Sequence, residues 1–252
     1  MTMQSSLFDE ETVNALREIF NSFPRKVVDY LVIDEAEAQH VHEHHHHHEH
    51  DHMHGCPTCG EALMLAKELM RVSDGKLEFI VLDKNDDRAK ELKPRYVPAF
   101  IYGSPNKNVR LYGLPSGQEF APFIYIHKYI STGELTLPKE VIDTVKEIDT
   151  PLHIKIFVTP ECPYCPLVVD AMNQMALVNS NLLVETIEAI ELPLEADMYG
   201  VAYVPDIVIT DPARMDEYGV EPIERINGYL PPDQMVEVLK AVAEKASSQK
   251  KS

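Results

Sequence analysis

The sequence lacks features that would mark whole classes of protein. No run of about 18 apolar residues occurs, so no transmembrane helix is expected. Residues 1–9 contain neither the basic segment nor the apolar segment of a signal peptide. Basic residues are few: 23 Lys and Arg against 41 Asp and Glu give a formal net charge of −18. Because phosphate binding needs clustered Lys and Arg, this charge argues against nucleic acid and anionic membranes as partners and favours proteins.

Cysteine is also scarce, and all four copies fall in two CxxC pairs, at Cys56 and Cys59 and at Cys162 and Cys165. None is left for a structural disulfide framework, which fits catalytic or metal-binding use in a reducing compartment. Together with the absent signal peptide, this distribution leads us to expect a cytoplasmic protein.

The second pair lies in the stretch Thr159 to Pro166, between a β-patterned run, Ile154 to Val158, and a segment with helical spacing. Two cysteines three residues apart lie on the same side of a first helical turn and can close a small disulfide ring. The first sulfur then meets unpaired backbone N-H groups and the positive end of the helix dipole. Such a position lowers a thiol pKa from about 8.5 toward roughly 3.5 to 7.5, which makes a thiolate nucleophile available near neutral pH.

The arrangement repeats along the chain. From the first cysteine of each pair to a downstream Val-Pro the distance is 42 residues in the first half and 43 in the second. The 252 residues are enough for two ordinary domains. We therefore predict an internal duplication of an αβαβαββα unit, with domains at residues 1–133 and 134–252. Predicted elements include a strand at Lys26 to Ile33, helices after Cys59 and Cys162, a short helix at Asp86 to Arg95 and strands at Ala99 to Tyr102, Val109 to Tyr112 and Asp206 to Thr210.

Ten of the twelve histidines fall between residues 40 and 54, with three carboxylates among them, in an insertion of about twenty residues before the first CxxC. Imidazoles with interspersed carboxylates suit Zn, Ni or Cu, whereas the alternative is a solvated low-complexity loop. A Cys2His2 zinc site with the first CxxC pair is a further alternative. The candidate metal ligands are His44, His46, His48, His50, His52 and His54.

Three longer motifs carry a family resemblance: residues 156–167 around the second CxxC, residues 112–120 (YGLPSGQEF), and residues 187–190 followed by Val204-Pro205. The chain resembles the protein disulfide oxidoreductases of heat-loving archaea and bacteria over nearly its whole length. The resemblance implies an α/β fold of two tandem thioredoxin-like domains, each with a central mixed sheet flanked by helices. It also implies an enzyme that reduces, forms or isomerises protein disulfides without a required cofactor, with a thioredoxin-reductase-like flavoprotein as electron donor.

The resemblance also implies residue roles. Cys56 and Cys162 would be the exposed attacking thiols, and Cys59 and Cys165 the resolving ones. Facing the two sites would be cis-prolines, whose preceding residues pair with an extended client strand. These substrate-binding residues are Val97, Pro98, Val204 and Pro205.

The competing hypotheses are a metal-handling protein, in which the His-rich loop and the first CxxC bind metal on a thioredoxin-like scaffold, and a chaperone-like module that binds unfolded clients. For a proton acceptor beneath a CxxC, Asp34 and Glu35 are candidates by proximity alone. His127 and His153 are isolated and receive no role. The direction of exchange, as reductase, oxidase or isomerase, stays open because it depends on reduction potentials.

Overall fold

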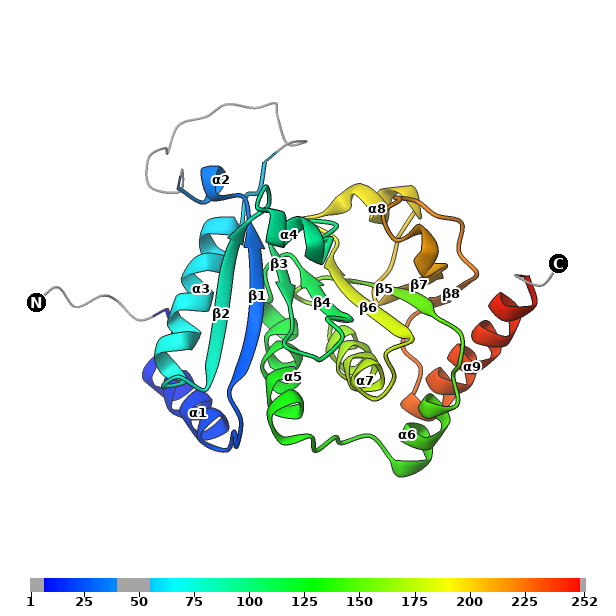
Figure 1. The fold of residues 1–252 in the computed structure, drawn as a ribbon, viewed down its shortest axis with the longest axis horizontal. Coiled ribbons are helices and arrows are strands. Elements are labelled where there is room, and N and C mark those ends of the chain that lie inside the picture. The colour runs from blue at the N-terminus through cyan, green and yellow to red at the C-terminus, as the bar shows by residue number, and fades with distance from the viewer. Residues whose placement is uncertain (1–6, 40–54, 250–252) are drawn as a thin grey trace, which may run out of the picture.

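The computed structural model describes residues 7–39 and 55–249 (Figure 1). An eight-stranded mixed sheet runs through both halves of the chain, in the order β2-β1-β3-β4-β6-β5-β7-β8. The strands are β1 (Val27–Ile33), β2 (Leu77–Asp83), β3 (Ala99–Ile101), β4 (Val109–Tyr112), β5 (Leu152–Val158), β6 (Leu182–Glu188), β7 (Asp206–Thr210) and β8 (Glu224–Asn227).

Each half has the same strand pairing. In the first half β1 pairs in parallel with β2 and antiparallel with β3, which pairs antiparallel with β4. In the second half β5 pairs in parallel with β6 and antiparallel with β7, which pairs antiparallel with β8. A parallel pair, β4 with β6, joins the halves into one sheet. The predicted α/β class with a central mixed sheet is confirmed.

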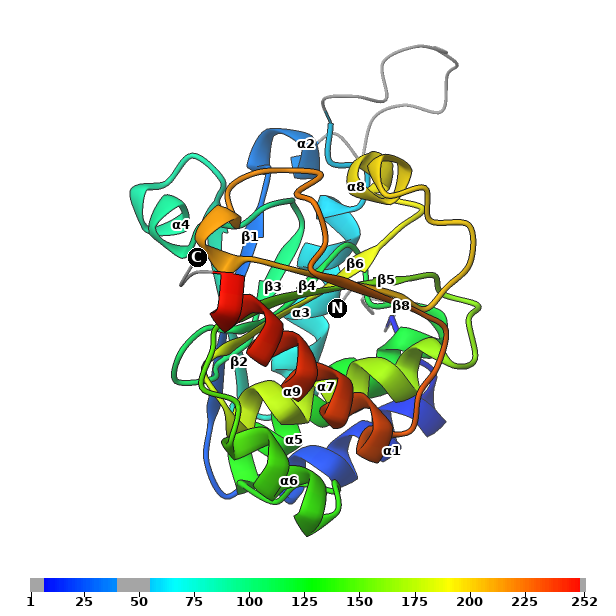
Figure 2. The same cartoon turned by 90° about the vertical axis from the view of Figure 1, so that its right-hand side faces the viewer.

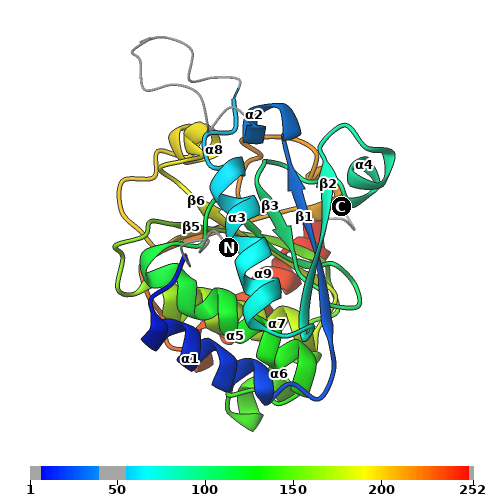
Figure 3. The same ribbon diagram turned by 90° about the vertical axis from the view of Figure 1, so that its left-hand side faces the viewer.

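Helices cover both faces of this sheet. In Figures 2 and 3, helices α1, α5, α6, α7 and α9 lie in the lower part of the molecule, and α2, α4 and α8 lie at the top. No helix of the described chain is long and apolar enough to cross a membrane. The helices are α1 (Glu10–Asn21), α2 (Glu35–Gln39), α3 (Cys59–Val72), α4 (Asp87–Leu92), α5 (Phe120–Thr132), α6 (Lys139–Lys146), α7 (Cys165–Val178), α8 (Pro193–Met198) and α9 (Pro232–Gln249).

Buried apolar side chains form two clusters, one on each face of the sheet. The larger joins α1, α3, α5, α7 and α9 to strands of both halves, and the smaller lies beneath α4 and α8. Alternate residues of the central strands serve the two clusters, as the two-residue period of a strand requires. The CxxC segments are thereby fixed to a core that both halves share.

Two details differ from the sequence-based expectation. A short helix, α2, follows β1 where no helix was predicted. The helix predicted over Asp86 to Arg95 ends at Leu92, because Pro94 cannot continue a helix and Lys93 adopts a left-handed backbone conformation with φ 49°. Arg95 therefore leaves the helix, and its side chain turns into the interior.

Candidate active sites

The two CxxC pairs form disulfides, each at the start of a helix. Cys56 bonds to Cys59, the first residue of α3, and Cys162 bonds to Cys165, the first residue of α7. Cys59 and Cys165 are fully buried. The first cysteines are less open than expected of attacking thiols, with 4% of Cys56 and 7% of Cys162 exposed. Access to each sulfur therefore depends on the hollow in front of it.

At the second site, backbone groups surround the Cys162 sulfur. The Cys165 backbone N-H donates to Cys162 Sγ at 3.1 Å, as expected for a sulfur at a helix N-terminus. The carbonyl oxygen of Val204 lies 3.6 Å from the same sulfur, and the Val204-Pro205 peptide bond is cis. Backbone donors and a neighbouring backbone acceptor thus frame the point at which a client sulfur would approach.

A cavity of about 560 Å³ opens beside Cys162. Its wall includes Tyr164, Ile190, Tyr203 and Val204. Ile190 is 71% and Tyr203 85% exposed, an unusual state for large apolar side chains that surround one hollow. The hollow has the character of a binding groove for an apolar or neutral peptide segment.

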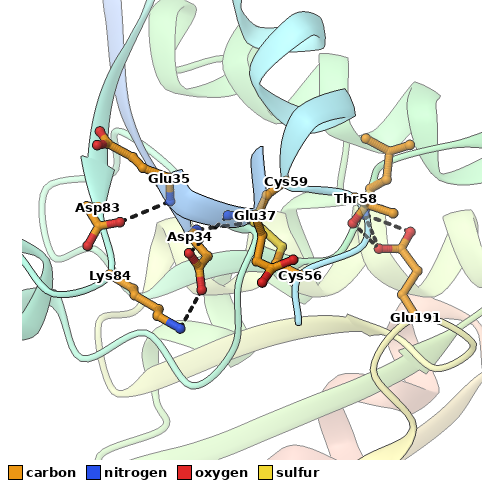
Figure 4. Close-up of a disulfide and its surroundings, with 10 residues drawn as sticks. Asp34, Glu35, Glu37, Cys56, Thr58, Cys59, Asp83, Lys84 and Glu191 are labelled. Atoms are coloured by element: carbon orange, nitrogen blue, oxygen red, sulfur yellow. Dashed lines mark hydrogen bonds and ion pairs between the residues drawn. A yellow bond between two sulfur atoms is a disulfide. The ribbon is translucent and has the colours of Figure 1, made fainter. Parts of the chain in front are cut away.

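The first site has polar surroundings (Figure 4). The backbone N-H of Asp34 donates to Cys59 Sγ at 3.3 Å, and the Asp34 carboxylate forms an ion pair with Lys84 at 2.5 Å. The hydrogen bond from Lys84 lowers the pKa of Asp34. Glu35 is exposed and points away from the disulfide, so of the two proton-acceptor candidates only Asp34 lies at the site. The Val97-Pro98 bond is cis, as in the second half.

Each site also touches the opposite half of the chain. Glu191, from the loop after β6, accepts a hydrogen bond from Thr58 Oγ1 at 2.7 Å, within the first CxxC (Figure 4). Burial raises the pKa of Glu191. Conversely, Gln118 of the first half donates its backbone N-H to the Pro160 carbonyl at 2.8 Å, just before the second CxxC. These contacts span more than 40 residues, and no local pattern indicates them.

Close approach at Pro160 requires a glycine. A Cβ at Gly117 would lie 2.3 Å from the Pro160 carbonyl oxygen, and the Gly117 φ of +57° is itself unfavourable for other residues. Gly117 starts a short 3-10 turn that packs against α7. The turn places its last residue, Glu119, inside the protein.

Glu119 is a buried carboxyl, 2% exposed, and neither of its oxygens has a hydrogen-bond partner among the described residues. Burial raises its pKa to about 8. It lies on the turn that packs against α7, whose first residue is Cys165. The sequence analysis did not identify Glu119, although it lies within the YGLPSGQEF motif of residues 112–120.

A buried ion network joins the halves away from the disulfides. Glu195 accepts hydrogen bonds from Arg95 and, at 2.7 Å, from Lys155 Nζ. Glu185 pairs with His153 and lies 3.3 Å from Arg95 Nε. Although burial alone would raise the pKa of Glu185, the cations around it lower that pKa to about 2. His153, which received no role from the sequence, is part of this structural network.

The other isolated histidine is also structural. His127 is fully buried, and its Nε2 lies 2.6 Å from the Asp29 carboxylate. Neither histidine lies among the residues that line the cavity at Cys162. Both therefore satisfy buried carboxylates within the core.

The metal prediction is not addressed by these contacts. His44, His46, His48, His50, His52 and His54 lie outside the described residues. Within the ranges 7–39 and 55–249, no group of three or more His, Cys, Asp or Glu side chains is placed to hold a metal ion. Metal binding by the His-rich segment stays a prediction of the sequence.

Comparison with known proteins gives concordant matches. The Thioredoxin domain family matches residues 152–221. The AhpF component of alkyl hydroperoxide reductase from Staphylococcus aureus (strain NCTC 8325 / PS 47) is 28% identical over 137 residues, which cover 46% of this chain. The matched part is 27% of that relative's length, so the relative's activity as a whole does not transfer to this chain.

Solved structures match over almost the whole chain. A protein disulfide oxidoreductase from Aeropyrum pernix k1 is 25% identical with a TM-score of 0.74, covering 94% of both chains. The NTD_N/C domain of alkylhydroperoxide reductase AhpF from Enterococcus faecalis (V583), 20% identical, has a TM-score of 0.72 and covers 92% of this chain and 99% of its own; it shows the shared fold. With this fold along its length and a disulfide at each CxxC, the chain is a thioredoxin-like thiol-disulfide oxidoreductase.

Proposed function

We propose that the chain exchanges disulfides with client proteins at two sites, one in each of two domains, residues 1–133 and 134–252. Cys162 and Cys56 are the attacking thiols, and Cys165 and Cys59 are the resolving thiols. The observation that carries the proposal is the Cys162 sulfur at the N-terminus of α7, with an open cavity beside it and the Val204 carbonyl 3.6 Å away.

In the reducing direction, the Cys162 thiolate attacks one sulfur of a client disulfide. A mixed disulfide forms, and the first client sulfur leaves as a thiolate. The Cys165 thiolate then attacks Cys162 Sγ, which releases the second client thiolate and forms the Cys162-Cys165 disulfide. Two electrons pass from the enzyme dithiol to the client, and both client thiolates take protons. The reverse sequence oxidises a client dithiol.

The backbone beside each attacking sulfur supports recognition of an extended client. Val204 at the second site, and Val97 at the first, would pair with a client strand and hold its disulfide in line with the attacking sulfur. The following prolines, Pro205 and Pro98, fix the direction of that backbone. Because main-chain pairing reads no side chains, it suits an enzyme with many protein clients.

Glu119 fits the role of proton acceptor for Cys165. A resolving thiol fully buried at the start of α7 must lose its proton before it attacks, and water cannot surround it there. Glu119 has a pKa raised to about 8 by burial, which places it near that of a thiol. The proton would move from Cys165 Sγ to the Glu119 carboxylate and return when the disulfide is reduced.

The enzyme disulfide must be reduced again after each turnover. We propose a thioredoxin-reductase-like flavoprotein as the electron donor, as the family resemblance implies, with the cytoplasm as the compartment. The relatives that are components of alkyl hydroperoxide reductases support a partner in reductive chemistry. The exchange itself needs no bound cofactor, because the two thiols carry the electrons.

The test is reductant-driven reduction of a disulfide-bonded model protein by chelator-treated enzyme. Each single variant, Cys56→Ser or Cys162→Ser, is expected to retain turnover through the other site, whereas the double variant should fall to the rate of the reductant alone. Cys165→Ser should accumulate a mixed disulfide between Cys162 and the client, visible under non-reducing conditions. A wild-type rate no faster than the reductant alone would exclude the proposed function.

A further inference from the structure

The two sites have equivalent hollows of opposite chemical character. In each half the chain runs from a strand (β2 or β6) through a short helix (α4 or α8) to the Val-Pro segment. A cavity beside each Val-Pro segment is lined by residues from these same positions, about 420 Å³ at Val97 and about 560 Å³ at Val204. The internal repeat makes them counterparts.

The walls differ in charge. Around the second cavity the short helix and the segment before Val204 contribute Ala196, Val201 and Tyr203, with Asp197 as the acidic side chain of this segment. The cavity at Val97 has four cations in the corresponding segments: Lys84, Lys90, Lys93 and Arg95. Its lining, as far as the structure describes it, contains one carboxylate, Asp216. In a chain with a net charge of −18, this is a local reversal of sign.

Two of the four cations are poorly neutralised. Lys90 lies 3.6 Å from Asp87, and Lys93 lies 3.5 Å from Asp216, with lysine side chains 62% and 57% exposed. Such exposed pairs contribute little and exchange readily for another anion. Arg95, in contrast, is held by Glu195 and by two backbone carbonyls, and Lys84 is held by Asp34. Lys90 and Lys93 are therefore the groups available to a ligand.

The basic cavity is connected to the first disulfide. Val97, in its wall, immediately precedes the cis-proline of this half. Lys84, also in the wall, forms an ion pair with Asp34, whose backbone N-H donates to Cys59 Sγ (Figure 4). An extended segment paired with Val97 would run past the lysines.

We propose that the first CxxC site selects client disulfides flanked by Asp or Glu, whose carboxylates bind Lys90 and Lys93, while the second site takes neutral or apolar segments. This inference rests on the proposed exchange activity and assigns the substrate class of its first site. The chemistry is the same at both sites: Cys56 attacks the client disulfide, Cys59 resolves, and two electrons pass from this dithiol to the client. Charge complementarity acts on encounter and binding, so it raises kcat/KM and weakens with salt.

The experiment uses variants of the full chain with one functional site each. Cys162→Ser/Cys165→Ser leaves the first site, and Cys56→Ser/Cys59→Ser leaves the second. Three disulfide peptides that differ only in flanking Asp, Ser or Lys residues are reduced with dithiothreitol as the electron source. At low salt the first-site enzyme is expected to favour the Asp peptide over the Ser peptide by about three- to tenfold in kcat/KM. This preference should disappear near 1 M salt.

Adding Lys90→Gln/Lys93→Gln to the first-site enzyme should remove most of this preference while leaving the Ser peptide's rate unchanged. The matched control is Lys139→Gln/Lys146→Gln on α6, which removes two exposed lysines paired with Asp143 and should change neither rate. Equal rates for the three peptides at the first site, or an equal preference at the second, would overturn the inference. No turnover of any peptide at either site would instead overturn the exchange function itself.

Discussion

Replacement of Glu195 with glutamine is expected to lower the free energy of unfolding by about 3 to 5 kcal/mol. Glu195 is fully buried and accepts hydrogen bonds from both Lys155 and Arg95. Glutamine keeps the size of the side chain but removes its charge. Lys155, itself fully buried, would then lack an anionic partner at 2.7 Å, and its remaining contact would be the Tyr199 hydroxyl at 3.2 Å.

The loss is large because removing one partner leaves the desolvation cost of the other in place. Burial already lowers the pKa of Lys155, although Glu195 and Glu185 oppose this effect. Without Glu195 the lysine would lose its proton at still lower pH or draw water into the core. Arg95 would also lose an anchor that holds the first half against the second.

Urea unfolding of Glu195→Gln, followed by circular dichroism, measures the change. Glu217→Gln is the matched control, because Glu217 forms an exposed pair with Arg214 and should change the free energy of unfolding by less than about 1 kcal/mol. Equal small effects in both variants would show that the buried network adds little to stability, as is known for ion pairs that hydrophobic residues can replace.

Replacement of Glu119 with glutamine is expected to change how stability depends on pH. The carboxyl has a pKa of about 8 in the folded protein, against an ordinary value of 4.5. Below pH 4.5 it is protonated in both states and imposes no penalty. Between pH 4.5 and 8 the unfolded state releases the proton and the folded state keeps it, so the stability of the folded state falls as pH rises. The full shift corresponds to roughly 5 kcal/mol.

Glutamine cannot ionise, so Glu119→Gln should lack this decline. The free energy of unfolding of the variant minus that of the wild type should rise by about 3 to 5 kcal/mol between pH 4.5 and 8.5, measured by urea unfolding at several pH values. Glu134→Gln, at an exposed position, is the control and should follow the wild type at every pH. If the Glu119→Gln and wild-type curves run parallel, the carboxyl ionises normally in the fold.

The same variant addresses the proposed proton transfer. If Glu119 accepts the Cys165 proton, Glu119→Gln should slow release of the mixed disulfide on Cys162 while leaving its formation unchanged. Single-turnover reduction of a client disulfide, followed by acid quench, separates the two steps. A variant that slowed both steps alike would indicate a structural role.

The sequence predicted the parts that depend on local pattern. A CxxC pair after a strand and before a helix indicates a redox disulfide, because both the sulfur spacing and the helix N-terminus are local features. The repeated distance from each CxxC to a Val-Pro likewise indicated a duplication, and the strand pairing repeats in the two halves. The boundaries at residues 133 and 134 stay a prediction, since a single sheet runs through both halves.

Alone, the sequence determined that this protein has two disulfide-forming CxxC pairs in an α/β fold. The tertiary structure decided which charged groups surround them. Glu191 binds Thr58 across 133 residues, and Arg95 binds Glu195 across 100. No periodicity encodes such contacts, because each partner has an unremarkable local sequence and the pairing depends on β4 lying beside β6. Burial, which sets the pKa of Glu119, likewise exists only once the halves have packed.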